Sequence, residues 1–552
     1  MALSYWSPGW RDQTLQSLSN GQSFDLIVVG GGITGAGIYR EATAKGLKVL
    51  LVEQKDFAWG TSSRSSKMVH GGLRYLGKGQ FGLAKDSVTE RQKLMEQLKG
   101  LVDPLPFLMG HYKGGFPGPW IFDKLLAIYD LFAGKRYRQF VKSQVNDFYA
   151  PGMKQRELLG ATRFMDAVTD DARLVMRVLA DGNEQGGIAL NYLKATGVMR
   201  SGSEVERNTK VIGLYLKDEL SGKELQVQAN AVVNASGAWT DELRQMLGNK
   251  KSIRPLRGSH LVIPFWRLPV AFSVSFFHPK DKRPVFVFPW EGQVVIGTTD
   301  LDHHNTMLSE ASITENEVTY LLDAANSQFD HAALKREDII SSWSGVRPVV
   351  VDEYSAEDVA ATNKPSDEKR EHMVWDDAGC ISIAGGKLTT FRLLALEVLR
   401  AAQPYLQNNL SISDLDAPSD FSESDESVLI GDHKLSKQRR QRLVGRYGDI
   451  ANQLVEQADI DDLTLLGNTE VCLQELFWAC ENEAVEHLDD LLLRRVRIGM
   501  LYPEGAIHLI QPWTELLRER LQWPIQKWDE EWHRYKNIIA DHYSLPNQKE
   551  CV

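Results

Sequence analysis

Hydrophobic residues near the start of the chain form two short runs on either side of a glycine-rich turn. Residues 24–29 read FDLIVV, and residues 47–53 read LKVLLVE. Continuous aliphatic and β-branched runs of this length are typical of parallel strands that are buried on both faces. The residues IYREATAKG, between the turn and the second run, predict a helix that ends at Gly46. The pattern therefore predicts a strand–helix–strand unit that begins an α/β domain.

A second pattern, between residues 246 and 375, consists of short runs rich in β-branched and aromatic residues. These runs include HLVIPF, VFVFPW and QVVIGTTD. The tetrapeptide PWEG at residues 289–292 separates two of them and predicts a hairpin turn. The pattern predicts an antiparallel sheet, in a domain that would close a ligand pocket against the first domain.

From residue 425 onward the apolar residues recur at helical spacing among many charges, as in VEHLDDLLLRRVRIGM. A stretch rich in Ser, Asp and Glu precedes them, from residue 411 to residue 432, and indicates a linker. The C-terminal part is therefore predicted to be all-helical, with a role in packing or dimerisation.

Composition excludes several classes of protein. The chain has 552 residues and a net charge of −10, from 63 Lys and Arg against 73 Asp and Glu. This length requires more than one core, and an acidic chain is not typical of nucleic-acid binders. The four cysteines form no C-x-x-C pair, so we expect no disulfide framework, no metal site and a reducing compartment. The N-terminus has no signal-peptide pattern, and no run of about 18 apolar residues predicts a membrane span.

The turn between the first two strands reads GGGITGAG, in which Gly30, Gly32 and Gly35 form a G-x-G-x-x-G motif. Gly30 would make the tight turn, Gly32 would let the backbone approach a pyrophosphate, and Gly35 would allow close packing of helix on strand. Glu53, about twenty residues further on, could bind ribose hydroxyls. The alternative is a turn that serves packing alone, and the motif by itself does not distinguish NAD from FAD.

Two further strand-to-glycine turns lie far downstream. AVVNASGAWTDEL spans residues 231–243, and CISIAGGKLTTFRLLALEVL spans residues 380–399. The second turn places a helix N-terminus, with free N–H groups, beside a pair of glycines. Three such turns indicate one extended ligand that distant segments contact together.

Residues 61–76, TSSRSSKMVHGGLRYL, fit neither a helix nor a strand period. Together with DLIVVGGGITGAG, VVNASGAW, RGSHLVI, FVFPWEGQVVIGTTD, SGVRPVV and IAGGKLTTFR, in chain order, they resemble the FAD-dependent glycerol-3-phosphate dehydrogenases of the respiratory, quinone-linked type. The resemblance covers about residues 20–400. It implies an α/β plus α+β fold: a Rossmann-like, D-amino-acid-oxidase-like FAD-binding domain, an antiparallel-sheet substrate domain and an all-helical C-terminal domain.

The same resemblance divides the chain into domains. The FAD-binding domain would be discontinuous, with segments at residues 20–95, 151–245 and 376–410. Residues 96–150 would form a helical insertion that contacts a membrane, residues 246–375 the substrate-binding cap, and residues 425–552 the C-terminal domain.

The resemblance also implies a set of FAD contacts. Hydroxyl and backbone N–H groups after the second strand would bind the pyrophosphate and ribitol, and glycines would let the backbone pass the isoalloxazine ring. The predicted set is Gly30, Gly32, Gly35, Glu53, Thr61, Ser62, Ser63, Ser66, Lys67, His70, Gly71, Gly72, Leu73, Val211, Ser236, Gly237, Trp239, Gly386, Lys387, Leu388, Thr389 and Thr390.

The implied activity is oxidation of glycerol 3-phosphate to dihydroxyacetone phosphate by hydride transfer to FAD. The phosphate needs cations, and the hydroxyl proton needs a base. By resemblance the base is His260, and the other catalytic residues are Arg347 and Lys387. The alternatives are a structural histidine and surface salt bridges. The predicted substrate contacts are Arg74, Tyr75, Arg347, Arg370 and Lys387.

Residues 119–132, PWIFDKLLAIYDLF, are apolar around most of a helix and precede Lys135, Arg136 and Arg138. This combination is typical of a helix lying on an anionic membrane surface, and the alternative is a helix buried between domains. The resemblance implies a quinone as electron acceptor. It also implies a peripheral position on the cytoplasmic face of the inner membrane, or in the cytoplasm, and a homodimer is one candidate assembly.

Three other functions stay open at this stage. A glycerol-3-phosphate oxidase would pass electrons to oxygen, and a flavin oxidoreductase of the same fold would act on another hydroxy or amino acid. A flavin-binding protein without activity is the third. The presence of Arg74, His260, Arg347 and Lys387 argues against the last one.

Overall fold

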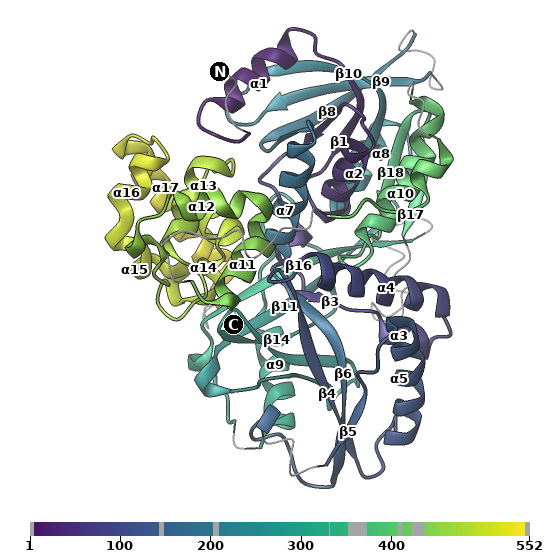
Figure 1. Cartoon of the computed structure of the whole chain (residues 1–552), viewed down its shortest axis with the longest axis vertical. Helices are drawn as coiled ribbons and strands as arrows, with labels where there is room; N and C mark the ends of the chain where they lie inside the picture. The colour runs from purple at the N-terminus through teal and green to yellow at the C-terminus, as the bar shows by residue number, and fades with distance from the viewer. Residues whose placement is uncertain are drawn as a thin grey trace.

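The computed structural model describes residues 5–142, 148–202, 209–330, 332–351, 372–406, 411–421 and 435–546. Figure 1 shows two domains that each contain a sheet, one above the other, and a helical C-terminal domain beside them. The predicted fold class is confirmed.

The upper domain is built on a sheet in which β17, β18, β10, β1, β2 and β7 follow one another. From β18 to β7 the neighbours are parallel, and the apolar runs of β1 and β2 are largely buried, as predicted. Strands β9 and β8 extend antiparallel from β10, and α2 packs between α7 and α10. The bounds are β1 Phe24–Val29, β2 Val49–Val52, β7 Ile188–Leu190, β8 Leu193–Arg200, β9 Val211–Asp218, β10 Glu224–Asn234, β17 Met373–Asp376, β18 Cys380–Ala384, α1 Trp10–Ser19, α2 Ile33–Ala44, α7 Asp171–Glu184, α8 Thr240–Met246 and α10 Phe391–Ala402.

The lower domain contains a larger sheet in the order β15, β11, β14, β13, β12, β4, β6 and β3, with β16 on β11 and β5 on β6. Its pairs are antiparallel except for β12 with β4. The predicted hairpin is present, with Trp290 paired with Gln293 across its turn. The bounds are β3 Met68–Val69, β4 Val102–Tyr112, β5 Gln139–Val141, β6 Leu158–Thr169, β11 Ile253–Pro264, β12 Ser273–Phe277, β13 Pro284–Trp290, β14 Gln293–Gly297, β15 Leu301–Asp302, β16 Ser341–Val350, α3 Leu73–Gly77, α4 Phe81–Gln97, α5 Pro119–Ala133 and α9 Glu315–Gln328.

Residues 96–150 are not a separate helical insertion. They contain the predicted helix as α5, but they also contain β4, which joins β12 to β6 within the larger sheet. Strand β6 lies in the same sheet, although the sequence predicts that residues 151–245 belong to the FAD-binding domain. The partner of Phe107 in β12 is Ser273, far along the chain, and a pairing at this separation leaves no local pattern in the sequence.

The C-terminal domain is helical over its described residues, as predicted. Its residues Leu491 and Val496 share one hydrophobic core with Trp290 and Trp343 of the larger sheet. The domain is therefore packed against the larger sheet, rather than connected by a linker alone. Its helices are α11 Lys437–Tyr447, α12 Ala451–Glu456, α13 Leu473–Asn482, α14 Ile498–Leu501, α15 Ile507–Ile510, α16 Thr514–Arg520 and α17 Ile525–Ile538, with π-helical turns η11 Asp490–Arg495 and η14 Ile539–Tyr543.

Candidate functional site

The glycine motif forms the predicted turn from β1 into α2. Gly30 has a φ of 112°, a left-handed conformation that favours glycine. A Cβ atom at Gly35 would lie 1.9 Å from the Gly30 carbonyl oxygen, so only glycine allows the helix to start this close to the strand. Gly32 is the N-cap of α2. Gly32, Ile33 and Thr34 at this helix N-terminus line the cavity that begins here, which is an arrangement suited to a pyrophosphate.

Glu53 follows β2 and lines the same cavity. Its two carboxylate oxygens accept hydrogen bonds from the main-chain N–H groups of Gly31, at 2.7 Å, and Lys55, at 2.9 Å. Burial raises the pKa of this carboxyl above its ordinary value, and the backbone donors partly oppose that rise. The side chain is thus held at the mouth of the glycine turn.

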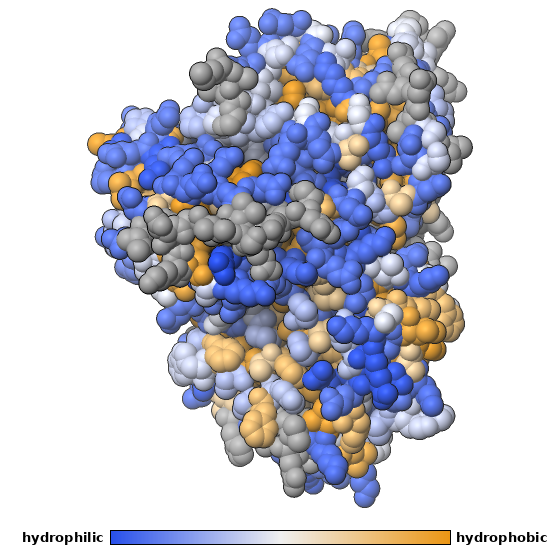
Figure 2. All heavy atoms as spheres, viewed as in Figure 1, coloured by the Kyte–Doolittle hydropathy of each residue, from blue (hydrophilic) through white to orange (hydrophobic). Residues whose placement is uncertain are grey.

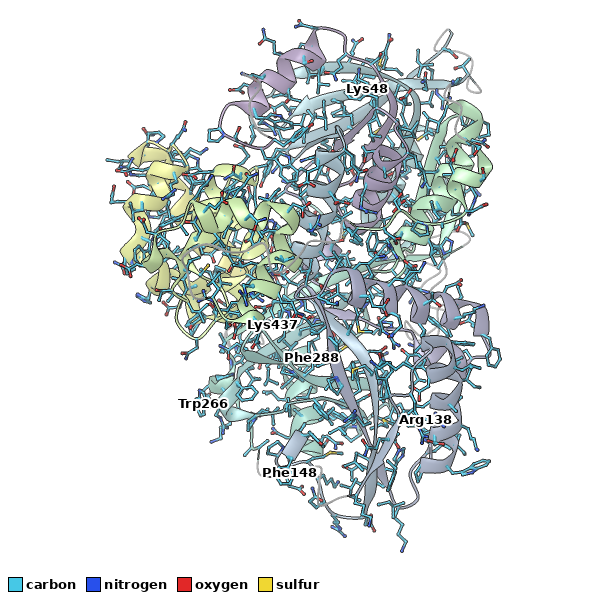
Figure 3. The ribbon with its side chains drawn as sticks, viewed as in Figure 1. Lys48, Arg138, Phe148, Trp266, Phe288 and Lys437 are labelled. Carbon is cyan, nitrogen blue, oxygen red and sulfur yellow. The ribbon has the colours of Figure 1, made fainter. Side chains whose placement is uncertain are left out.

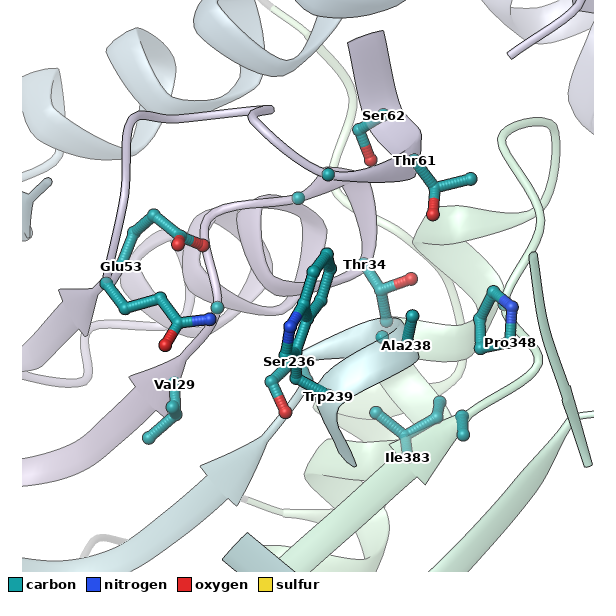
Figure 4. Close-up of a pocket in the computed structure, with 18 of the residues that line it drawn as sticks. Val29, Thr34, Glu53, Thr61, Ser62, Ser236, Ala238, Trp239, Pro348 and Ile383 are labelled. Carbon is teal, nitrogen blue, oxygen red and sulfur yellow. The ribbon is translucent and has the colours of Figure 1, made fainter. Parts of the chain in front are cut away.

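One elongated cavity connects the three strand-to-glycine turns, as Figure 4 shows. It extends from Glu53 past Thr61 and Ser62 to Pro348 and the turn after β18. The predicted cofactor residues that line it are Gly30, Gly32, Glu53, Thr61, Ser62, Ser236, Gly237, Trp239, Gly386 and Leu388. An extended dinucleotide fits this donor set, because glycine turns, hydroxyls and a helix N-terminus follow one another along its length.

Several residues that line the cavity are not among those that the sequence predicts. Leu193, Lys194 and Ala195 line the cavity beside Glu53, whereas Val211 lies outside it and donates its main-chain N–H to Ala378. Their place in the chain could have indicated this: β8 begins directly after β7, and β7 is the parallel neighbour of β2, which leads to Glu53. Gln54, Trp59, Ser65 and Pro348 were also missed.

The remaining predicted cofactor residues do not line the cavity. Gly71 packs against α4 and α5, since a Cβ atom there would lie 2.4 Å from Val88. The Thr389 hydroxyl donates to the His70 carbonyl at 3.1 Å, which joins the first loop to the last turn. Direct contact with FAD stays a prediction for this group, which is Gly35, Ser63, Ser66, Lys67, His70, Gly71, Gly72, Leu73, Val211, Lys387, Thr389 and Thr390.

The loop from Thr61 to Lys67 has two faces. The Ser62 hydroxyl accepts from the Ile33 N–H at 2.9 Å, next to the cavity. Ser66 points the other way, and its hydroxyl lies 2.8 Å from Nε2 of His260. Lys67 is fully buried and bonds Asp171 at 2.8 Å. Burial is the main cause that lowers the pKa of Lys67 to about 7, and the charge of Arg497 lowers it further. Asp171 acts in the opposite direction and raises this pKa.

His260 lies on β11 and is almost completely buried, with its ring stacked on Trp343 at 5.0 Å. Burial, followed by the charges of Arg347 and Lys67, holds the pKa of His260 well below its ordinary value, so the ring is neutral at pH 7. Its Nδ1 has no hydrogen-bond partner among the described residues. If Nε2–H donates to Ser66, Nδ1 is the nitrogen that can accept a proton.

Arg347 lies on β16 next to Pro348, which lines the cavity. Its guanidinium lies across Gly258 of β11, where a Cβ atom would come within 2.3 Å of Nη2. Nη1 lies 3.2 Å from an Asp300 carboxylate oxygen, and Nη2 donates to the Thr298 hydroxyl at 3.1 Å. These contacts fix the direction of the guanidinium fork, as bidentate recognition of an anion requires.

Lys387, between the cavity residues Gly386 and Leu388, contacts Tyr75, with its ammonium 4.2 Å from the centre of the Tyr75 ring. Arg74 and Tyr75 lie on α3, which follows the left-handed Gly72. Arg370 lies outside the described residues. The cations Arg347 and Lys387, each next in the chain to a cavity residue, suit an anionic substrate. No cluster of His, Cys, Asp and Glu among the described residues could hold a metal ion.

Comparison with known proteins shows the family of the chain. Residues 25–384 match the family described as "FAD dependent oxidoreductase", and residues 415–527 match the "C-terminal domain of alpha-glycerophosphate oxidase". The chain is 33% identical to an aerobic glycerol-3-phosphate dehydrogenase of Staphylococcus saprophyticus over 89% of each chain. It is 32% identical to glycerol-3-phosphate dehydrogenase 2 of Mycobacterium bovis over 93% of this chain and 88% of that protein.

A solved structure shows the same architecture. The glycerol-3-phosphate dehydrogenase from Bacillus halodurans, complexed with FAD, superposes with a TM-score of 0.73 at 27% identity and 97% coverage of both chains. The α-glycerophosphate oxidase from Mycoplasma pneumoniae, at 17% identity and a TM-score of 0.53, shares the fold.

Proposed function

Because the chain belongs to the FAD-dependent oxidoreductases, and among them to the glycerol-3-phosphate dehydrogenase family, we propose that it oxidises sn-glycerol 3-phosphate to dihydroxyacetone phosphate. FAD, when bound, supplies the acceptor for the hydride from C2. The observation that carries the substrate is the fixed Arg347 fork, next in the chain to the cavity residue Pro348 and close enough to the buried, neutral His260 for its charge to lower the pKa of that ring.

Each residue of the site has a role in this proposal. Arg347 binds the phosphate through its planar fork, and Arg74 and Lys387 add positive charge around it. His260 accepts the proton of the C2 hydroxyl, which it can do because its imidazole is neutral. Ser66 and Trp343 orient the ring.

Anaerobic addition of sn-glycerol 3-phosphate to the FAD-loaded protein is expected to bleach the visible flavin bands. The measurement is an absorption spectrum before and after addition. Glycerol lacks the phosphate and should leave the bands unchanged at the same concentration. Bleaching by lactate or proline but not by sn-glycerol 3-phosphate would keep the fold and reject the proposed substrate.

We also propose that the reduced flavin passes its electrons to a quinone. Re-oxidation of the bleached protein should then be faster with a soluble quinone analogue than with air. Rapid re-oxidation by air with stoichiometric hydrogen peroxide would assign the oxidase activity instead.

The proposal places the protein at a membrane surface through α5. Trp120 and Leu131 on this helix are 72% and 75% exposed, and Phe116 just before it is 79% exposed. Figure 2 shows apolar residues gathered at the edge of the molecule where α3, α4 and α5 lie in Figure 1. None of the described helices is long and apolar enough to cross a bilayer. A contact within one leaflet is therefore what we propose.

Replacing both Trp120 and Leu131 with Ser should weaken binding to vesicles that contain anionic lipid by about tenfold or more, because each side chain loses its apolar transfer free energy. Co-sedimentation measures the effect. Trp266→Ser is the control, since Trp266 is 76% exposed and lies at the opposite edge of the lower domain (Figure 3). Equal losses in both proteins, or no loss in the α5 variant, would reject this surface.

A further inference from the structure

The C-terminal domain contacts the cofactor side of the molecule through the charged segment DLLLRRVRIG, residues 490–499. The side chains of Arg494, Arg495 and Arg497 are each at most 1% exposed. Burying a charge is costly unless it is paired and hydrogen-bonded, and a buried ion pair contributes little net stability. Net stability therefore does not explain why this segment buries three arginines. Their contacts indicate another role.

Arg497 reaches the loop that lines the cavity. Its Nη2 donates to the Ser63 carbonyl at 2.6 Å and lies 3.4 Å from an Asp171 carboxylate oxygen. Asp171 in turn accepts from the Ser65 N–H at 2.9 Å, from the Ser65 hydroxyl at 2.7 Å and from the Lys67 ammonium at 2.8 Å. One arginine of the C-terminal domain thus holds Ser63 directly, and it holds Ser65 and Lys67 through Asp171.

Two more contacts join the same parts. Asp56, which is fully buried, accepts from Arg494 Nε at 2.5 Å and from Arg495 Nη1 at 2.7 Å. The Tyr543 hydroxyl, at the end of η14, lies 3.2 Å from both Nε and Nη2 of Arg64. Residues 56–67 are therefore bound to the C-terminal domain at three separate points.

The other face of this segment lines the FAD cavity. Trp59, Thr61, Ser62 and Ser65 are lining residues, whereas Asp56, Ser63, Arg64 and Lys67 are not. The segment is held between the cavity and the C-terminal domain, so a displacement of one face moves the other. Among the described residues of the C-terminal domain, only the segment 494–497 donates hydrogen bonds to Asp56 and Ser63.

We propose that the C-terminal domain positions the FAD-binding segment 56–67, with Arg497 and Tyr543 as positioning residues, so that docking of this domain and binding of FAD are thermodynamically coupled. The reason is that the cavity face is ordered only when the opposite face is bound. Coupling is reciprocal. Weakening the interdomain contacts should weaken FAD binding, and FAD should protect the segment 490–497 from local opening.

The main test is the FAD dissociation constant of Tyr543→Phe, measured by flavin fluorescence on the refolded apoprotein. Loss of one buried hydrogen bond of about 1 kcal/mol corresponds to an increase of about fivefold in the dissociation constant. Ser341→Ala is the matched control. It also removes one buried hydroxyl that bridges to the C-terminal domain, by donation to the Met500 carbonyl at 2.6 Å, but it does not contact residues 56–67.

Arg497→Met and Arg497→Lys form the second pair. The Met variant should lose more FAD affinity than Tyr543→Phe, and Lys should restore part of it because it keeps the charge near Asp171. A dissociation constant for Tyr543→Phe within twofold of wild type, or an equal increase in Ser341→Ala, overturns the proposal. If Arg497→Met does not fold, the FAD dissociation constant of Tyr543→Phe still tests the proposal.

Hydrogen exchange provides a readout that does not depend on variants. Adding FAD to the apoprotein should slow amide exchange in residues 490–497 more than in α16, which lies in the same domain and packs against α13. Equal slowing in both regions would indicate general stabilisation and would also overturn the coupling.

Discussion

His260→Asn is expected to slow reduction of the flavin by sn-glycerol 3-phosphate by about 10²- to 10⁴-fold, the range for loss of a general base. The spectrum and affinity of FAD should stay unchanged, because His260 does not line the FAD cavity. Stopped-flow absorbance under anaerobic conditions measures the rate. The physical reason is that the asparagine amide cannot accept the hydroxyl proton, although it keeps a polar group near Ser66.

The pH dependence of the wild-type rate checks the same assignment. Burial lowers the pKa of His260, so the neutral ring persists below pH 6.5. The rate should therefore stay level as the pH falls to that value and drop only when the pH passes through the lowered pKa. Ser66→Ala should slow the reaction less than His260→Asn, because the ring remains. A His260→Asn protein with an undiminished rate would show that another group is the base.

Arg347→Leu is expected to lower kcat/KM for sn-glycerol 3-phosphate by about 10²-fold or more. Hydrogen bonds to charged groups contribute about 1.5–3 kcal/mol each, and a fork that binds a phosphate makes two of them. Most of the loss should appear in KM, because the phosphate is bound in both the ground state and the transition state. Steady-state kinetics with a saturating acceptor measure it.

Gly258→Ala tests the position of Arg347 without removing its charge. The new Cβ atom would lie 2.3 Å from Nη2 and 2.5 Å from Nη1, so the guanidinium must move. KM should rise in this variant as well. Arg267→Leu is the control, because Arg267 lies in the same domain and pairs with Asp338. An unchanged KM in Arg347→Leu would remove Arg347 from the phosphate site.

The sequence by itself determined the first unit of the fold. The strand, the glycine turn, the helix and the acid after the second strand all lie within residues 24–53. Each of their signals depends on neighbours a few residues away, as with Gly35 against the Gly30 carbonyl. The antiparallel sheet and the helical C-terminal domain were predictable for the same reason, since their periods are local.

Only the tertiary structure decided which side chains of a loop face which ligand. Ser66 is predicted to contact FAD from its place in the sequence, and the structure shows in addition that its hydroxyl lies next to His260, on a strand of the other domain. Ala195, at the start of β8, lines the cavity, whereas the predicted Val211 does not, and no local pattern in the sequence distinguishes these two positions.

The role of the C-terminal segment also needed the structure. DLLLRRVRIG reads as a charged helical stretch, and nothing local shows that its arginines are buried against Asp56 and Ser63. These contacts join residues more than four hundred positions apart, and their geometry is set by how three domains pack together. Local periodicity carries no information about such distances, whereas the folded core determines them within fractions of an ångström.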